Sequence, residues 1–186
     1  TGNSGREIAA ELGNAGAKTA VSVRTGAAFV PHPSNPTVVK VATWLTHHLP
    51  QAASDALLAR LRPNFADIGL PLPASPPTQT YPVVGFALPE AVKAGKVTTY
   101  QDIAEFTPTG VRFVDGKTAA FDTVILATGY RPTVDFIHPT PQLNKQGQLL
   151  HREQFPNLPP VGFHYPATSG WLQAIGHVAA ETVRQL

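Results

Sequence analysis

The residues of this chain that are best suited to bind a ligand are gathered in its opening stretch, Thr1–Ile8. Gly2 and Gly5 flank Asn3 and Ser4, and good helix formers follow them. In the dinucleotide fingerprint G-x-G-x-x-G, glycines allow a tight turn, the close approach of a pyrophosphate and the packing of the helix on its sheet. Gly2 and Gly5 fit the second and third glycines, and the first would precede Gly2 by two positions. We therefore expect this loop to hold a pyrophosphate at a helix N-terminus, and the chain to begin inside a motif of a larger protein.

A second candidate, Arg24, lies nineteen residues after Gly5. In dinucleotide-binding folds, a residue near this position contacts the adenosine ribose. An acidic residue there bonds the 2′-hydroxyl of NAD, whereas an arginine accommodates the 2′-phosphate of NADP. Arg24, with Thr25 beside it, therefore favours NADPH. The alternative is a solvated arginine at the end of a strand.

The elements that would position these residues follow from hydrophobic periodicity. Ile8 and Leu12 lie four residues apart, which predicts a helix from Gly5 to about Ala15. The stretch Lys18–Val23 alternates and contains β-branched residues, which is typical of a strand. A glycine turn, a helix and a strand in this order form the opening half of a Rossmann unit, so an α/β fold is expected.

The middle of the chain is predicted to consist of short helices between proline-rich loops. The stretch Pro63–Pro82 holds six prolines in twenty residues, so it is expected to be an irregular covering loop or a mobile connection. A second loop is expected at Gly26–Pro36. The predicted helices are Val38–Leu45, Asp55–Arg60 and Pro89–Ala94.

After Gly95 the pattern changes to strands that form a β-meander. The expected strands are Val97–Tyr100, Ile103–Phe106, Val111–Val114 and Thr118–Phe121, the last two joined by a turn at Asp115-Gly116. A continuous apolar run, Asp122–Leu126, predicts a buried parallel strand. The tail is expected to hold a turn at Asn144–Gly147, a short strand at Val161–Phe163 and a final helix after Gly170.

Composition excludes several classes of protein. The 186 residues contain no cysteine, so a disulfide framework, a cysteine-based zinc site and a CxxC redox pair are excluded within them, and a cytoplasmic location is expected. The net charge is +2 and the isoelectric point is near 9.0, without a basic cluster, so no nucleic-acid partner is expected. No apolar run approaches the ~20 residues of a membrane span. The seven histidines lack metal-ligand spacing, so no metal site is expected.

Three motifs together resemble the flavin-containing monooxygenase family. They are Gly2–Glu7, the strand end Val23-Arg24, and Ile125–Pro132 with its Ala-Thr-Gly-Tyr turn. The plant auxin-biosynthesis (YUCCA-type) monooxygenases and their bacterial relatives form the most similar branch. The segment Pro82–Phe86 through Gly95–Val97 also resembles that branch, as does Gly162-Phe163 followed by Gly170–Ile175. The resemblance covers nearly the whole chain.

This resemblance implies an enzyme in which an NADPH-binding domain is inserted into an FAD-binding domain. Residues 1–130 match a Rossmann-like, three-layer NADP-binding domain with a β-meander, and residues 131–186 match the C-terminal segment of the FAD-binding domain. The implied reaction inserts one oxygen atom of O2 into a small organic substrate, with NADPH and FAD as cofactors. The implied cofactor contacts, besides the loop and Arg24–Thr25, are Ala127, Thr128, Gly129, Trp171 and Leu172.

Each of these cofactor-binding roles has a purely structural alternative. Thr128 and Gly129 would serve equally as a sharp turn after a strand, and Trp171 and Leu172 as core residues of the last helix. The family's N-terminal FAD loop is absent, so this chain is not expected to hold FAD tightly or to turn over alone. No catalytic residue can be nominated, and the sequence does not specify the substrate or the oligomeric state. The rival functions are an NAD(P)H-dependent flavoprotein reductase and a non-catalytic nucleotide-binding domain.

Overall fold

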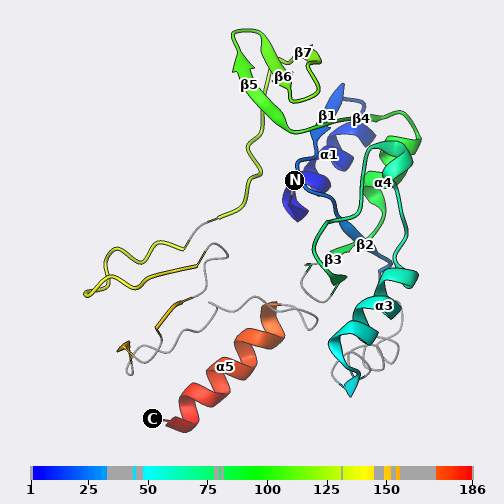
Figure 1. The fold of residues 1–186 in the computed structure, drawn as a ribbon. Coiled ribbons are helices and arrows are strands. Elements are labelled where there is room, and N and C mark those ends of the chain that lie inside the picture. The colour runs from blue at the N-terminus through cyan, green and yellow to red at the C-terminus, as the bar shows by residue number, and fades with distance from the viewer. Residues whose placement is uncertain are drawn as a thin grey trace. The chain divides into compact units, whose positions relative to one another are not determined.

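The computed structural model describes residues 2–32, 44, 48–77, 80, 82–130, 132–144, 149–151, 154–155 and 171–185. The chain divides into two compact units, Thr1–Gly129 and Tyr130–Leu186. Figure 1 shows the elements in chain order. They are α1 (Asn3–Asn14), β1 (Thr19–Ser22), β2 (Ala28–Val30), α3 (Gln51–Leu61), a 3-10 turn η1 (Ala66–Ile68), β3 (Pro82–Val84), α4 (Ala87–Lys93), β4 (Val97–Tyr100), β5 (Ile103–Thr107), β6 (Gly110–Phe113), β7 (Thr118–Ala120) and α5 (Trp171–Gln185).

Helix α1 and strands β1 and β4 form the part of the first unit that the sequence predicts best. Strand β1 pairs with β4 in parallel, with Thr19 opposite Val97 and Ser22 opposite Tyr100. Figure 1 shows α1 against this pair, as its packing contacts with both strands require. The predicted helix near residues 5–15 and the predicted strands near residues 18–23 and 97–100 are thereby confirmed.

A second parallel pair, β2 with β3, was not predicted. Phe29 of β2 lies opposite Val83 of β3, and both residues are buried. The prolines after Val30 predict a loop at Gly26–Pro36, whereas the three apolar residues before them form β2. The predicted helices at Asp55–Arg60 and Pro89–Ala94 correspond to α3 and α4, whereas the predicted helix at 38–45 lies almost wholly outside the described residues.

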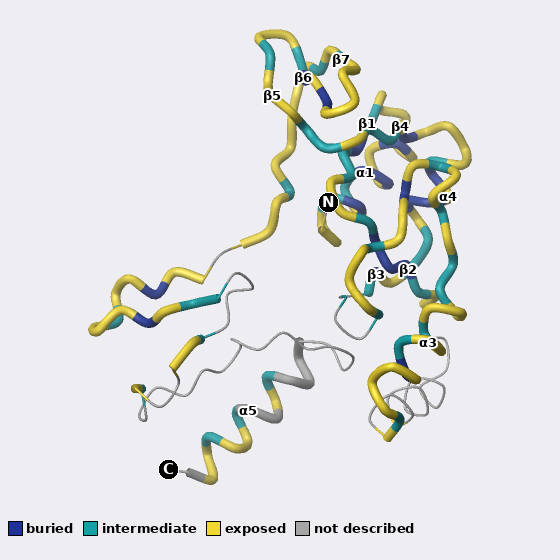
Figure 2. Tube along the Cα trace, in the orientation of Figure 1, coloured by how far each residue is buried: buried dark blue, intermediate teal, exposed yellow. Residues whose placement is uncertain are grey.

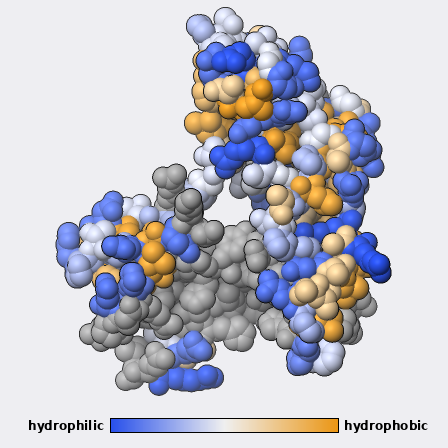
Figure 3. Space-filling model, viewed as in Figure 1, coloured by the Kyte–Doolittle hydropathy of each residue, from blue (hydrophilic) through white to orange (hydrophobic). Residues whose placement is uncertain are grey.

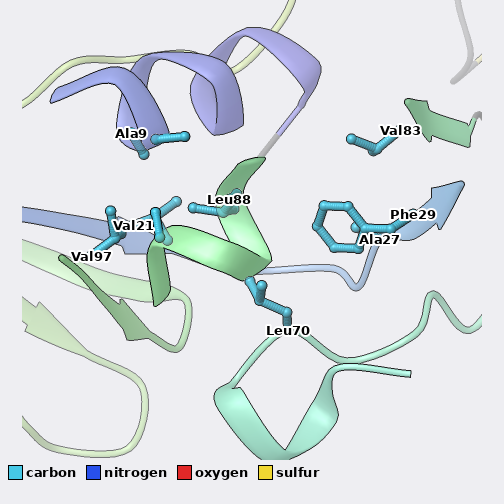
Figure 4. Packing of buried hydrophobic residues seen from close by; sticks show 10 residues of the cluster. Ala9, Val21, Ala27, Phe29, Leu70, Val83, Leu88 and Val97 are labelled. Atoms are coloured by element: carbon cyan, nitrogen blue, oxygen red, sulfur yellow. The ribbon is translucent and has the colours of Figure 1, made fainter. Parts of the chain in front are cut away.

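One apolar cluster joins these elements. Figure 4 shows the side chains of Ala9, Val21 and Leu88, from α1, β1 and α4, facing a common interior. Phe29 continues the cluster towards β3 and packs edge-on against Phe65, with ring centroids 5.6 Å apart. Figure 2 shows that the buried residues of the first unit concentrate where these elements meet. The cluster comprises Ala9, Ala10, Val21, Ala27, Phe29, Leu70, Val83, Leu88, Ala91 and Val97.

Strands β5, β6 and β7 form the predicted antiparallel meander. Tyr100, at the end of β4, stacks on Phe113 of β6 with ring centroids 4.2 Å apart, which ties the meander to the parallel pair. Phe106 and Val114 are each 58% exposed. In Figure 3, apolar surface accordingly lies among hydrophilic surface over this sheet.

The predicted buried strand Asp122–Leu126 is wrong. The segment is irregular, and Val124, Ile125 and Leu126 are 42%, 55% and 69% exposed. Figure 2 shows the chain leaving the meander as an exposed stretch. An apolar run becomes a buried strand only where a neighbouring strand accepts its backbone hydrogen bonds, and no described strand pairs with this one.

The second unit contains α5 and an isolated antiparallel bridge between Leu143 and Leu149. The predicted final helix after Gly170 is confirmed by α5. The predicted strand at 161–163 and most of the predicted turn at 144–147 lie outside the described residues. None of the helices among the described residues is both long and apolar enough to cross a membrane.

Candidate functional site

The N-terminal end of α1 and the carboxyl ends of β1 and β4 lie at the same edge of the first unit. At the other end of α1, a Cβ built on Gly13 would lie 2.6 Å from the Val97 side chain and 2.9 Å from the Lys96 carbonyl oxygen. The Lys96 ammonium also donates a hydrogen bond to the Asn14 side chain at 2.9 Å. The start of β4 therefore lies against the last turn of α1. Because β1 runs parallel to β4 in register, both strands run back towards the first turn of the helix.

This edge carries Arg24 and Thr25. The Val23 amide donates to the Tyr100 carbonyl oxygen at 2.8 Å, so the pairing of β1 with β4 continues one residue beyond β1. Arg24 and Thr25 follow in an exposed bend. No described residue forms an ion pair or a hydrogen bond with the Arg24 side chain, so its guanidinium is available to a ligand.

The first turn of α1 offers unpaired hydrogen-bond donors. Gly2 caps the helix with φ −78° and ψ −173°, no side chain bonds the cap, and no acidic residue lies in the first turn. The first N–H groups of an α-helix have no acceptor within the helix, and the aligned peptide dipoles place a partial positive charge there. Asn3, Ser4 and Gly5 all lie in this turn, so the residues predicted to hold a pyrophosphate are together at the N-terminus of α1.

Gly2 borders open space. A Cβ built on Gly2 meets no atom within 4 Å, and its φ is accessible to any residue. The packing of the chain itself therefore gives no reason for glycine at this position. The close approach of a ligand would give one, and an anion fits the donors around it.

Arg6, one turn into α1, is a buried charged residue that the sequence analysis did not single out. It lies on the face of α1 that also carries Ala9, Ala10 and Gly13, and it is only 7% exposed. Its guanidinium carbon lies 5.5 Å from the ring centroid of Phe29. Arg6 stands three and four residues before Ala9 and Ala10, so the spacing of the apolar face is the signal that would have revealed its burial.

Burial of the Arg6 guanidinium lowers the pKa of this side chain to about 10, well below its usual range. The lowered pKa means that the charged guanidinium is held less favourably in the folded chain than in water. The cost applies in full at neutral pH, where the guanidinium is charged in both the folded and the unfolded chain. It diminishes only as the pH rises through about 10, the pKa of the folded chain.

The other residues predicted to contact a cofactor lie in other segments of the chain, and no described interaction links them to Arg24 or to the first turn of α1. Ala127, Thr128 and Gly129 lie in the irregular stretch after the meander, where the Ala127 amide donates locally to the Ile125 carbonyl oxygen at 3.1 Å. Gly129 has a φ of +88°, which favours glycine where the first unit ends. Trp171 and Leu172 begin α5 in the second unit.

A helix N-terminus and an arginine at one edge of a parallel strand pair define a candidate anion-binding site in a mixed α/β fold. The chain belongs to the flavin-binding monooxygenase-like family, whose model matches residues 1–182. The resemblance seen in the sequence motifs is thereby confirmed.

Individual relatives agree with this assignment. The chain is 32% identical over 169 residues to indole-3-pyruvate monooxygenase YUCCA1 of Oryza sativa subsp. japonica, covering 85% of this chain and 40% of that protein. It is 29% identical over 187 residues to flavin-containing monooxygenase 3 of Macaca mulatta, covering 94% of this chain and 35% of that protein. The chain therefore spans about two fifths of the length of the curated relatives it matches.

A solved structure shows a related fold. A mutant flavin monooxygenase from Stenotrophomonas maltophilia superposes with a TM-score of 0.51 at 22% identity, covering 100% of this chain and 49% of that one. The fold is accordingly a mixed α/β arrangement of small sheets that is similar to a flavin monooxygenase.

Proposed function

We propose that this chain is the NADPH-binding part, with an adjoining FAD-binding segment, of an NADPH- and FAD-dependent monooxygenase. Residues 1–130 would form the Rossmann-like NADP-binding domain, and residues 131–186 the closing segment of the FAD-binding domain. The observation that carries the proposal is that the open N-terminus of α1 and the exposed Arg24 lie at the same edge of β1 and β4. Membership of the family supports it.

The residues at this edge have distinct roles in the proposal. The free N–H groups of Asn3, Ser4 and Gly5 bind the diphosphate, and Gly2 allows it to come close to the backbone. Arg24, with Thr25, binds the 2′-phosphate that distinguishes NADPH from NADH. A charge-assisted contact of this kind is worth roughly 1.5–3 kcal/mol, or about 10- to 150-fold in affinity.

The remaining predicted contacts belong to the FAD side of the proposal. Ala127, Thr128 and Gly129 form the connection between the two domains, and Trp171 and Leu172 lie at the start of the helix that adjoins the flavin or the substrate. When bound, NADPH and FAD supply the reducing and oxygen-activating chemistry. This chain's own residues bind and orient the nucleotide that delivers the reducing equivalents.

The substrate in this proposal is a small organic molecule that receives one oxygen atom from O2. Indole-3-pyruvate is the first compound to test, because the names of the YUCCA relatives specify it. With the complete protein and 18O2, one labelled oxygen atom is expected in the product. Oxidation of NADPH without a labelled product would favour a flavoprotein reductase. The cytoplasmic location expected from the sequence is likewise part of the proposal.

The nucleotide role is tested by replacing Arg24. In calorimetric titrations, Arg24→Ala should raise the dissociation constant of NADPH by at least about tenfold and leave that of NADH nearly unchanged. Arg112→Ala is the control, because Arg112 is an exposed arginine of the meander that pairs with Glu105 at 2.8 Å. An equal loss of affinity for NADPH and NADH in Arg24→Ala would show that Arg24 does not bind the 2′-phosphate.

A further inference from the structure

Among the described arginines, Arg6 is the one that is buried, and it differs from the two arginines that have polar partners, Arg62 and Arg112. The Arg62 guanidinium donates a hydrogen bond to the Pro77 carbonyl oxygen at 2.9 Å, and that of Arg112 binds the Glu105 carboxylate. Arg6 is the most buried of the three, yet its only described partner is the ring of Phe29. A buried charge is normally paired, because losing its hydration is costly. Arg6 therefore lacks the partner that its burial calls for.

The Arg6 side chain keeps a small exposed surface, since the residue is 7% exposed. Among the described residues, no buried side-chain nitrogen or oxygen lacks a hydrogen-bond partner. Since the Arg6 nitrogens make no such bond, they must lie within the small surface that this side chain keeps. The contact of the guanidinium with the Phe29 ring is a cation–π contact, which uses the face of the guanidinium and not its N–H donors.

Arg6 lies close to the start of α1. The Arg6 amide donates to the Gly2 carbonyl oxygen at 3.3 Å, so the residue stands one turn from the cap. Side chains on an α-helix lean towards its N-terminus, which brings the guanidinium back to the turn with free N–H donors. The nearest acidic residues on the helix, Glu7 and Glu11, are exposed and do not pair with it.

We propose that Arg6 is a diphosphate-binding residue, whose guanidinium and the first-turn amides of α1 hold the same anionic group of the nucleotide. This inference rests on the proposed function and deepens it. A planar guanidinium presents two parallel N–H groups that match two phosphate oxygens. NADPH and NADH share the diphosphate, so Arg6 contributes to the binding of both, whereas Arg24 contributes to NADPH alone.

The test compares NADPH and NADH binding to the 186-residue chain and its variants by calorimetric titration. Arg6→Met keeps an unbranched apolar stem and removes the charge, so both dissociation constants should rise by about tenfold or more, and by the same factor. Arg24→Ala should raise only that of NADPH. Arg62→Met is the matched control, because it removes a partly buried arginine that has a partner, and it should leave both constants unchanged.

The melting temperature of the nucleotide-free chain separates binding from a structural role. Arg6→Met should melt at the same or a higher temperature than the parent chain, because it removes a buried charge that makes no ion pair or hydrogen bond with a described residue. Arg62→Met should melt lower, because it loses a hydrogen bond. A lower melting temperature for Arg6→Met would show that its contact with Phe29 is structural, and would overturn the inference.

Two outcomes distinguish this inference from the proposed function. If the parent chain binds NADPH and Arg6→Met binds it equally well, the inference fails while the site at Arg24 stands. If the parent chain binds neither nucleotide, the proposed function fails and the inference fails with it. If Arg6→Met does not fold, Arg6→Lys provides the measurement. Lysine keeps the charge but not the paired N–H groups, so the dissociation constants of both nucleotides should rise by the same factor, which should be less than tenfold. Unchanged dissociation constants would again overturn the inference.

Discussion

At the N-terminal end of α1, Arg6 and Arg24 form no ion pair with any residue that the structure describes, whereas the cations of the β5–β6–β7 sheet are paired. There, Arg112 binds Glu105 at 2.8 Å and Lys117 binds Asp115 at 3.0 Å. These charged side chains of the meander are thus paired with one another. The α1 end presents backbone N–H groups, one buried guanidinium and one exposed guanidinium that all favour an anion. This difference is the reason for proposing the α1 end, and not the meander, as the ligand site.

The largest effect on stability in this comparison is expected at Gly13, which holds α1 on β4. In Gly13→Ala, the new methyl group would lie 2.6 Å from the Val97 side chain and 2.9 Å from a backbone oxygen. The free energy of unfolding should fall by about 1–3 kcal/mol, as for other overpacked cores, and NADPH binding should weaken with it. Urea denaturation followed by circular dichroism measures the first effect. An unchanged midpoint would mean that α1 does not pack on β4 as described.

Gly2→Ala should separate binding from stability at the other end of the same helix. Space around Gly2 is open, and alanine loses some capping preference while it restricts the unfolded chain, so the two small effects on stability oppose each other. The methyl group would occupy room needed by the diphosphate. The loss of one hydrogen bond, about 1 kcal/mol, weakens nucleotide binding about fivefold. Nucleotide affinities equal to those of the parent chain would show that the ligand does not approach Gly2.

The smallest effect is expected in the meander. Glu105→Gln removes an ion pair that is exposed on both sides, so the melting temperature should change by at most about 2 °C and NADPH affinity should not change. Arg112 holds the pKa of Glu105 below its usual value, so the small contribution of the pair is present at neutral pH and is lost as the pH falls through that lowered pKa. Thermal melting of both chains at neutral and acidic pH checks this sign. A marked loss of nucleotide binding would break the distinction between the two regions.

Local sequence patterns predicted the helices and strands whose formation depends on residues close by in the chain. The spacing of Ile8 and Leu12 located α1, alternation located β1, and the turn at Asp115-Gly116 located the β6–β7 hairpin. These signals are strong because one amphipathic face or one turn specifies each element. The glycine loop was located for the same reason, since a helix start is a local feature.

Features that depend on distant partners could not be read in the same way. Asp122–Leu126 has the composition of a buried strand, but composition does not provide the neighbouring strand that would accept its hydrogen bonds. Strands β2 and β3 were missed because their pairing joins residues more than fifty positions apart. Arg6 was missed because a single charge on an apolar face resembles an interruption of the pattern, and only the position of Phe29 shows what lies against it.

The location of the nucleotide is the most direct test of the site at the α1 edge. In 1H–15N spectra of the chain titrated with NADPH, the amide signals of Asn3, Ser4, Gly5 and Arg24 should shift together, with one dissociation constant. The signals of Thr118–Ala120 in β7 should stay in place. Saturable shifts confined to the meander, with the signals of the first turn of α1 unmoved, would contradict the assignment of this edge as the nucleotide site.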